Sequence, residues 1–145
     1  MIGINRLRRW MDPVLMLMLG GIFVYSGMIK LADPDALFKD ILAYRIIGPE
    51  LAYPMTFFLP AYELVCGVAL LIPKLRHSAL LWISLMLLVF MLAILSAWVR
   101  GIDVSCGCFG SIDDGVASYD PLAWIMRDAA MLVMAGWLWF WSRKP

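Results

Sequence analysis

Four long runs of apolar residues limit what this chain of 145 residues can fold into more than any other feature. Each run has roughly the 20 residues that an α-helix needs to cross the hydrocarbon core of a bilayer. Because 63% of all residues are hydrophobic and only 16% are charged, the composition excludes a water-soluble domain of this length. The sequence predicts an all-α, polytopic membrane protein with spans at about 13–31, 51–72, 78–99 and 121–141.

The connections between these runs are short, and neither an internal repeat nor a linker divides the chain. We therefore expect a single transmembrane domain over residues 1–145, folded as an antiparallel four-helix bundle. The first run is followed by Lys30-Leu31-Ala32-Asp33 instead of a small-residue cleavage site, which favours a retained first span over a signal peptide.

A short helix is predicted between the first two spans. Asp33 is suited to cap its N-terminus, and Pro34 is suited to its first helical position. Its apolar residues fall on one helical face: Leu37, Phe38, Ile41, Leu42 and Ile46. Such a helix either lies in the extracytoplasmic membrane interface or packs over the mouth of the bundle.

Lysine and arginine residues predict the orientation, because short cytoplasmic loops collect them. One side of the bundle holds Arg6, Arg8, Arg9, Lys74, Arg76, Arg143 and Lys144. The other side holds Lys30, Lys39, Arg45 and Arg100, in longer loops that are rich in Asp and Glu. Both termini are thus expected in the cytoplasm and the loop at 100–120 outside it. A net charge of +1 gives no field that favours nucleic acid. The chain has so little polar surface that its expected surroundings are the lipid bilayer.

Two of the three cysteines lie one residue apart in this loop, which we call the cysteine loop. A disulfide between Cys106 and Cys108 would be strained, and strained, exposed disulfides are the reactive ones. Gly107 lacks the Cβ that would hinder the tight turn. Outside the cytosol such a pair persists as a disulfide, so Cys106 and Cys108 are the candidate catalytic residues. Arg100 nearby would favour a thiolate, and the loop aspartates would oppose it.

Two other interpretations of the cysteine pair stay open. The pair can form a purely structural disulfide, or it can bind a soft metal ion such as Cu(I) or mercury as thiolates. A tetrahedral zinc site is not expected, because His77 is predicted on the opposite side and the loop has no further cysteine.

Ionisable residues inside the spans are the second group of candidates. Glu63 lies in the second span, and Arg127 and Asp128 lie in the fourth. Since such residues are costly in lipid, they usually face the bundle interior and pair, which predicts a Glu63–Arg127 ion pair. This pair is either a clamp between helices or part of a proton or quinone site under the cysteine loop. Cys66 follows Glu63 on the same helical face, as packing or as a relay.

Several short motifs occur in order along nearly the whole chain. They are Tyr25-Ser26-Gly27, Lys30-Leu31-Ala32-Asp33-Pro34, Leu59-Pro60, Glu63-Leu64, Arg100-Gly101, Cys106-Gly107-Cys108-Phe109-Gly110 and Arg127-Asp128. With these motifs the chain resembles the MauE/DoxX family. The resemblance implies a four-helix protein of the bacterial inner membrane, associated with disulfide chemistry and thioredoxin-like partners during maturation of periplasmic enzymes. It also implies an architecture like that of DsbB and vitamin K epoxide reductase, although this chain lacks their second cysteine pair.

The leading functional hypothesis is a membrane thiol–disulfide oxidoreductase. Cys106 and Cys108 would exchange disulfides with an extracytoplasmic, thioredoxin-like protein. Electrons would pass to a membrane quinone in a pocket near Glu63 and Arg127. The alternatives are a non-catalytic maturation factor for a periplasmic enzyme and a soft-metal carrier for Cu(I) or mercury.

Overall fold

The computed structural model describes residues 2–102 and 121–142, and the side chains of residues 10–102 and 122–140 within them. This part of the chain is all-helical, as predicted. Its five helices are α1 (Ile2–Ala32), α2 (Pro34–Ala43), α3 (Pro49–Leu71), α4 (Arg76–Val99) and α5 (Pro121–Ser142). Four segments are long and apolar enough to cross a membrane: Trp10–Ala32, Pro49–Leu71, Arg76–Val99 and Leu122–Phe140.

The helices that contain the predicted spans differ from them mainly at the ends. α1 begins at Ile2, well before the apolar run, because a helix continues through the polar N-terminal residues. α3 runs unbroken through Pro54 and Pro60. Hydropathy therefore locates the part of a helix that lies in lipid, and it does not locate the helix ends.

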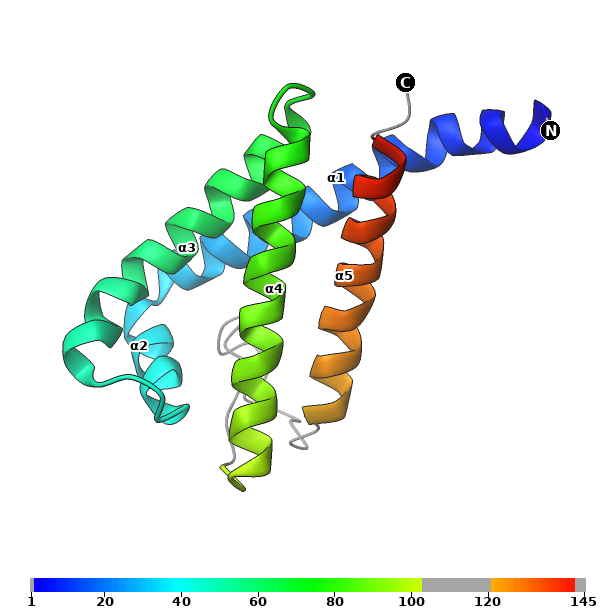
Figure 1. The fold of residues 1–145 in the computed structure, drawn as a ribbon. Coiled ribbons are helices and arrows are strands. Elements are labelled where there is room, and N and C mark those ends of the chain that lie inside the picture. Colours follow the sequence, from blue (N-terminus) through cyan, green and yellow to red (C-terminus); the bar gives the residue numbers. More distant parts are fainter. Residues whose placement is uncertain (1, 103–120, 143–145) are drawn as a thin grey trace.

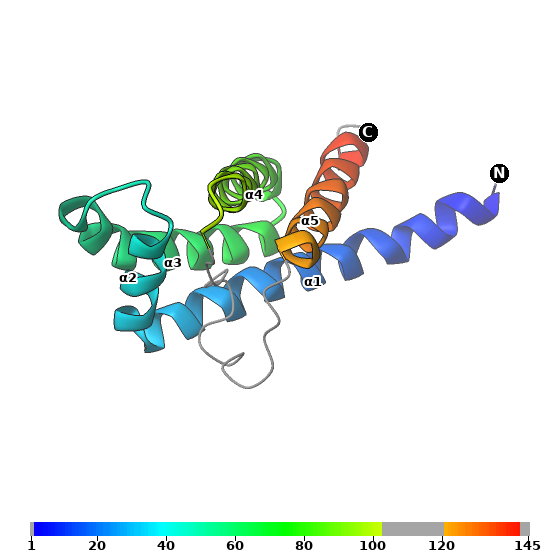
Figure 2. The same cartoon turned by 90° about the horizontal axis from the view of Figure 1, so that it is seen from below.

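The four long helices form two closely packed pairs, α1 with α3 and α4 with α5. Figure 1 shows α1 crossing obliquely behind α4 and α5, while α3 runs obliquely on the left and joins α4 at the top. The start of α1, the turn between α3 and α4, and the end of α5 lie at one end of the molecule, and α2 lies at the other. In the view of Figure 2, α4 lies beside α3 and α5 lies beside α1, in agreement with the contacts between these helices.

Glycines allow the closest helix contact, between α1 and α3. A Cβ added at Gly27 would lie 2.9 Å from the carbonyl oxygen of Pro60, and one at Gly67 would lie 2.9 Å from that of Gly20. Real Cβ atoms do not approach other atoms so closely, so these glycines are required for the contact. Small residues at helix contacts are a common means of packing in lipid. We call the contact at Gly20, Gly27 and Gly67 the glycine seam.

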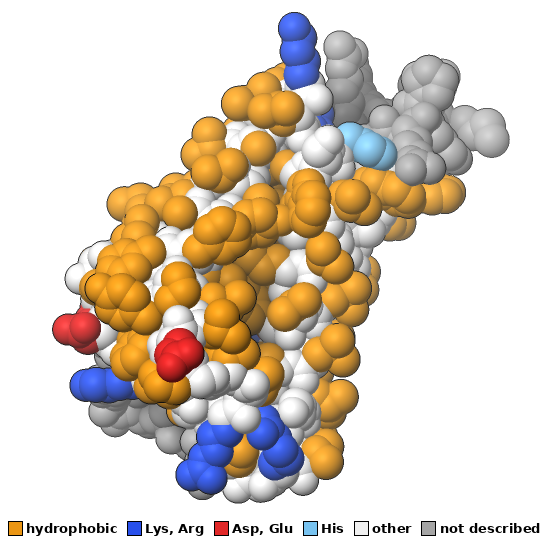
Figure 3. Space-filling view, turned by 60° about the vertical axis from the view of Figure 1, so that its left-hand side comes forward, with side chains coloured by type: hydrophobic (Ala, Val, Ile, Leu, Met, Phe, Trp, Pro, Cys, Tyr) orange, Lys and Arg blue, Asp and Glu red, His pale blue; other side chains and the backbone are white. Residues whose placement is uncertain are grey.

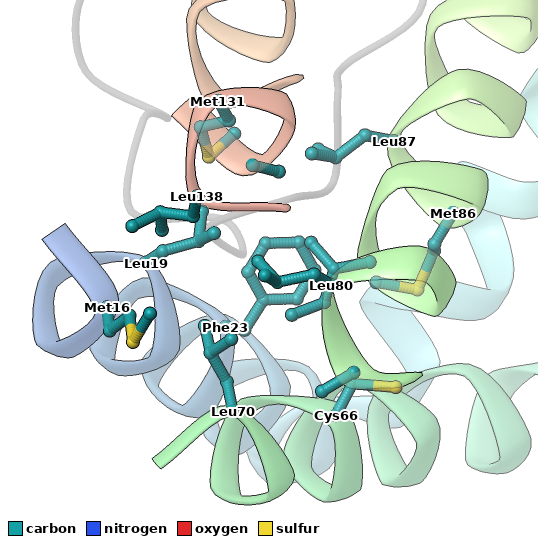
Figure 4. Packing of buried hydrophobic residues seen from close by; sticks show 13 residues of the cluster. Met16, Leu19, Phe23, Cys66, Leu70, Leu80, Met86, Leu87, Met131 and Leu138 are labelled. Carbon is teal, nitrogen blue, oxygen red and sulfur yellow. The ribbon is translucent and has the colours of Figure 1, made fainter. Parts of the chain in front are cut away.

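A cluster of buried apolar side chains joins both pairs of helices. Figure 4 shows Leu19 and Phe23 of α1 facing Leu80 of α4 and Leu138 of α5, while Leu70 adds from α3. Leu19, Leu70 and Leu80 are fully buried. The cluster thus fixes the position of the spans around a common interior.

The short helix α2 lies at the end of the molecule opposite the α3–α4 turn. The side chain of Asp33 accepts a hydrogen bond from the backbone N–H of Ala36 at 3.1 Å, so the predicted cap is confirmed. Leu37 is buried, and the ring of Phe38 meets that of Tyr53 edge to face. α2 packs against the ends of α1 and α3.

Large apolar side chains are also exposed around the outside of the four spans. Val65 on α3 and Val133 on α5 are 67% and 73% exposed. In Figure 3 hydrophobic side chains cover the middle of the visible face, and charged side chains gather mainly toward its lower part. Apolar exposure on this scale fits a lipid environment and not water. The chain is a multi-pass membrane protein.

Candidate functional site

Polar side chains from α1 and α3 meet inside the bundle. Lys30 Nζ donates a hydrogen bond to Glu63 Oε1 at 2.5 Å, and Ser26 Oγ donates one to Glu63 Oε2 at 3.2 Å. Ser26 and Lys30 lie one helical turn apart and therefore share the face of α1 that contacts α3. Lys30 and Glu63 are only 4% and 2% exposed. Each carboxylate oxygen of Glu63 thus has its own buried donor.

The prediction that Glu63 pairs with Arg127 is wrong, because Lys30 is its partner. The sequence predicts Lys30 to be a loop charge, since it stands at the end of the first apolar run. In the structure α1 continues past it to Ala32 and turns its side chain inward. The glycine seam holds α1 and α3 close enough for the lysine to reach the carboxylate.

Arg127 pairs with its neighbour in the chain, Asp128. Its Nη2 and Nε donate to Asp128 Oδ1 at 3.0 and 3.2 Å. The arginine side chain is 29% exposed, whereas that of Asp128 is 1% exposed. Both residues lie on α5, and both donors reach the same oxygen, so Asp128 Oδ2 takes no part in the contact.

Both pairs line one small cavity, about 30 Å³ in volume, between the four spans. Glu63 and Arg127 therefore belong to the same site although they do not pair. Phe90 of α4 also lines the cavity, and Lys30 Nζ lies 5.2 Å from the centre of its ring, within the range of a cation–π contact. The four charged residues, Lys30, Glu63, Arg127 and Asp128, are called the ion cluster below.

The ion cluster holds two positive and two negative side chains, so their formal charges cancel when all are ionised. Such pairing is what makes charge tolerable inside a membrane protein. The cluster can hold the spans together, and it can also bind a small hydrogen-bonding molecule in its cavity. Within the described residues no group of three His, Cys, Asp or Glu side chains is placed to hold a metal ion.

Cys66 lies on α3 one turn from Glu63, as predicted, and it is a buried free thiol. Figure 4 shows it within the apolar cluster, on the side of Leu70 and Met86. It does not line the cavity of the ion cluster. This position agrees with packing, and the relay role stays a prediction.

Arg100, predicted to act on the cysteine pair, contacts backbone at the end of α4. Its Nη2 donates to the carbonyl of Tyr44 at 2.6 Å, its Nη1 to that of Arg45 at 3.3 Å and its Nε to that of Ser96 at 3.1 Å. Arg45 has a positive φ of 51°, which is uncommon for a residue with a side chain. Arg100 therefore ties the connection after α2 to the end of α4.

The predicted catalytic group, Cys106, Gly107 and Cys108, lies outside the described residues, so its role stays a prediction. Sequence reasoning missed Ser26 and Lys30 as members of the site. Their spacing of four residues, opposite an acidic residue in another span, is the signal that would have identified them.

The model of the family described as "Methylamine utilisation protein MauE" matches residues 8–141. Neither the curated proteins nor the solved structures gave a match.

Proposed function

Since the chain belongs to the MauE family, we propose that it is a membrane thiol–disulfide oxidoreductase that serves the maturation of an extracytoplasmic enzyme. Family membership and the four spans are consistent with a membrane maturation role. The observation that carries the redox part is the Cys106-Gly107-Cys108 motif in a polar connection between two spans. A Cys-X-Cys pair closes a strained ring, and strained disulfides exchange readily.

The proposed partner is an extracytoplasmic thioredoxin-like protein. A thiolate of one protein attacks the disulfide of the other, a mixed disulfide forms, and one thiolate leaves. The second thiol of the attacking pair then displaces the partner. One pair is oxidised to a disulfide as the other is reduced to a dithiol, so the exchange itself needs no further oxidant.

A membrane quinone remains our proposal for the electron acceptor in repeated turnover. The cavity beside Glu63 and Arg127 has a volume of about 30 Å³. An engineered cavity that binds benzene measures about 150 Å³, so the cavity of the ion cluster does not fit a quinone ring as it stands. No electron-transfer step is therefore assigned to the ion cluster.

The proposed orientation places both termini in the cytoplasm and the cysteine loop outside the bacterial inner membrane. Lys30 is buried in the ion cluster and so does not count as a loop charge. That leaves Lys39, Arg45 and Arg100 as the exposed cations at the α2 end of the bundle. The seven basic residues predicted at the other end then form a clearer majority, which supports the orientation.

Trapping of the mixed disulfide tests the proposed function. Cys108→Ser should accumulate a reducible cross-link to the partner through Cys106, because the resolving thiol is missing. Cys106→Ser should accumulate less, and Cys66→Ser is the control that leaves trapping unchanged. The cross-linked species is separated on a non-reducing gel and identified by mass. The proposal fails if neither loop variant accumulates a mixed disulfide and the pathway survives loss of both thiols.

The contacts of Arg100 favour a second candidate, a non-catalytic maturation factor. Its guanidinium contacts three backbone carbonyls, which fixes the end of α4 next to α2. In that function the cysteine pair would only staple the loop that holds a client. Client binding that persists in the Cys106→Ser/Cys108→Ser double variant, with maturation unaffected, would select this candidate.

A further inference from the structure

Asp128 carries a buried oxygen atom without a hydrogen-bond partner. Its side chain is 1% exposed, and of its two oxygens the hydrogen bonds from Arg127 reach Oδ1. Oδ2 has no partner among the residues that the structure describes. A buried acceptor without a donor destabilises a protein by about 1–3 kcal/mol, and more when the group is charged. A hydrogen-bond donor beside this oxygen would remove that cost.

The cavity of the ion cluster lies beside Asp128 and has room for such a group. Its volume of about 30 Å³ exceeds the 10–15 Å³ that a single water molecule requires. A buried water also needs two to four polar partners. Asp128, Lys30 and Ser26 line this cavity and offer both acceptors and donors. The remaining lining is mainly apolar, with Ile22, Phe23 and Met131 among its residues.

We propose that Asp128 is a proton-binding residue that exchanges its proton through water held in this cavity. A proton arrives on a cavity water as hydronium, moves to Asp128 Oδ2 and leaves a neutral water behind. The reverse step returns the carboxylate and the hydronium. In the carboxylate form Oδ2 accepts a hydrogen bond from the water, and in the protonated form it carries the hydrogen itself. The site goes beyond the thiol chemistry proposed above and does not depend on it.

The groups around the cavity explain why Asp128, and not Glu63, takes the proton. Glu63 already receives two hydrogen bonds, one at each oxygen, from Lys30 and Ser26. Asp128 receives both hydrogen bonds from Arg127 at a single oxygen. The charged groups that face the cavity are Lys30 from α1, Glu63 from α3 and Arg127 from α5, and α4 contributes only Leu87 and Phe90.

Infrared spectroscopy of the full-length protein in lipid nanodiscs tests the proposal. The carbonyl stretch of a protonated carboxyl group is recorded while the pH is changed over the range in which the protein stays folded. We expect one buried carboxyl band that grows as the pH falls, and that shifts in D₂O. Labelling with [4-¹³C]aspartate should move the band, because Asp128 is the buried aspartate among the described residues. The infrared titration and the labelling use the wild-type protein, so neither measurement depends on the folding of a variant.

Variants locate the site and the water. Asp128→Asn should remove the band, and Glu63→Gln should leave it in place. Leu87→Phe should fill the cavity and slow the D₂O exchange at least tenfold while the aspartate is retained. Replacing both Cys106 and Cys108 by Ser should change nothing, which separates this test from that of the thiol chemistry. A band that does not titrate, that ignores the aspartate label, or that survives Asp128→Asn would overturn the proposal, as would unchanged exchange in Leu87→Phe.

Discussion

The two ion pairs of the ion cluster differ in construction. Lys30 and Glu63 join two helices, both are buried, and each oxygen of the carboxylate has a donor. Arg127 and Asp128 are neighbours on one helix, the arginine is partly exposed, and one carboxylate oxygen has no partner among the described residues. The first pair fixes α1 against α3, whereas the second leaves α5 with an open acceptor. Two pairs of equal formal charge thus differ in role: only in the Lys30–Glu63 pair do both carboxylate oxygens have a hydrogen-bond donor among the described residues.

The largest expected effect comes from breaking the first pair. Glu63→Leu or Lys30→Met alone leaves a buried charge without its partner and should lower the free energy of unfolding by about 3–5 kcal/mol. The double variant removes both charges and should recover most of the loss. Unfolding in mixed micelles, followed by tryptophan fluorescence, measures these values. A double variant as unstable as the single ones would show that the pair is not a unit.

The glycine seam beside that pair should show the next largest effect. Gly67→Ala places a Cβ within 2.9 Å of the backbone at Gly20, so α1 and α3 must move apart, at roughly 1–3 kcal/mol. Gly21→Ala is the matched control, because a Cβ there meets nothing within 4 Å. We expect it to be neutral or to stabilise α1 by up to about 1 kcal/mol. The same unfolding assay applies, and equal losses in both variants would show that the seam is not specific.

Breaking the second pair should have a smaller effect that depends on pH. Arg127→Gln leaves the Asp128 carboxylate without its cation, and we expect a loss of about 1–3 kcal/mol. The loss should shrink as the pH falls, because a proton on Asp128 removes the charge that the arginine offsets. Unfolding measured at several pH values checks this, with Asp128→Asn/Arg127→Gln as the control, because that variant has no carboxylate left to protonate. A loss in Arg127→Gln that stays constant with pH would contradict protonation of Asp128.

Arg100 lies outside the ion cluster and should show the smallest effect on global stability. Arg100→Lys loses the planar guanidinium that reaches two carbonyls beyond α2, yet the residue is exposed. We expect the free energy of unfolding to change by no more than about 0.5 kcal/mol. Amide hydrogen exchange at Arg45 and Ile46 should nevertheless become faster. Lys39→Ala, an exposed change on α2, is the control, and equal exchange in both variants would contradict the role of Arg100.

The sequence alone predicted the spans and the N-cap at Asp33, because hydropathy and capping depend on residues that are neighbours in the chain. It was not sufficient for the Lys30–Glu63 pair. A lysine at the end of an apolar run looks like a loop charge until the facing helix is known. The partners of Arg100 are backbone carbonyls, which have no signature in the sequence. The glycine seam was foreseeable in part, since Gly20 and Gly27 lie seven residues apart on one face of α1.

The intrahelical pairing of Arg127 and Asp128 also bears on the order of assembly during synthesis. Chains fold from the N-terminus as they are made. Lys30 and Glu63 can neutralise each other once α3 has entered the membrane, before α4 and α5 exist. α5 enters last, with its aspartate already next to an arginine of its own. α5 therefore requires no opposite charge from the helices that have already packed together. The Lys30–Glu63 pair between α1 and α3 stays intact while α5 is added.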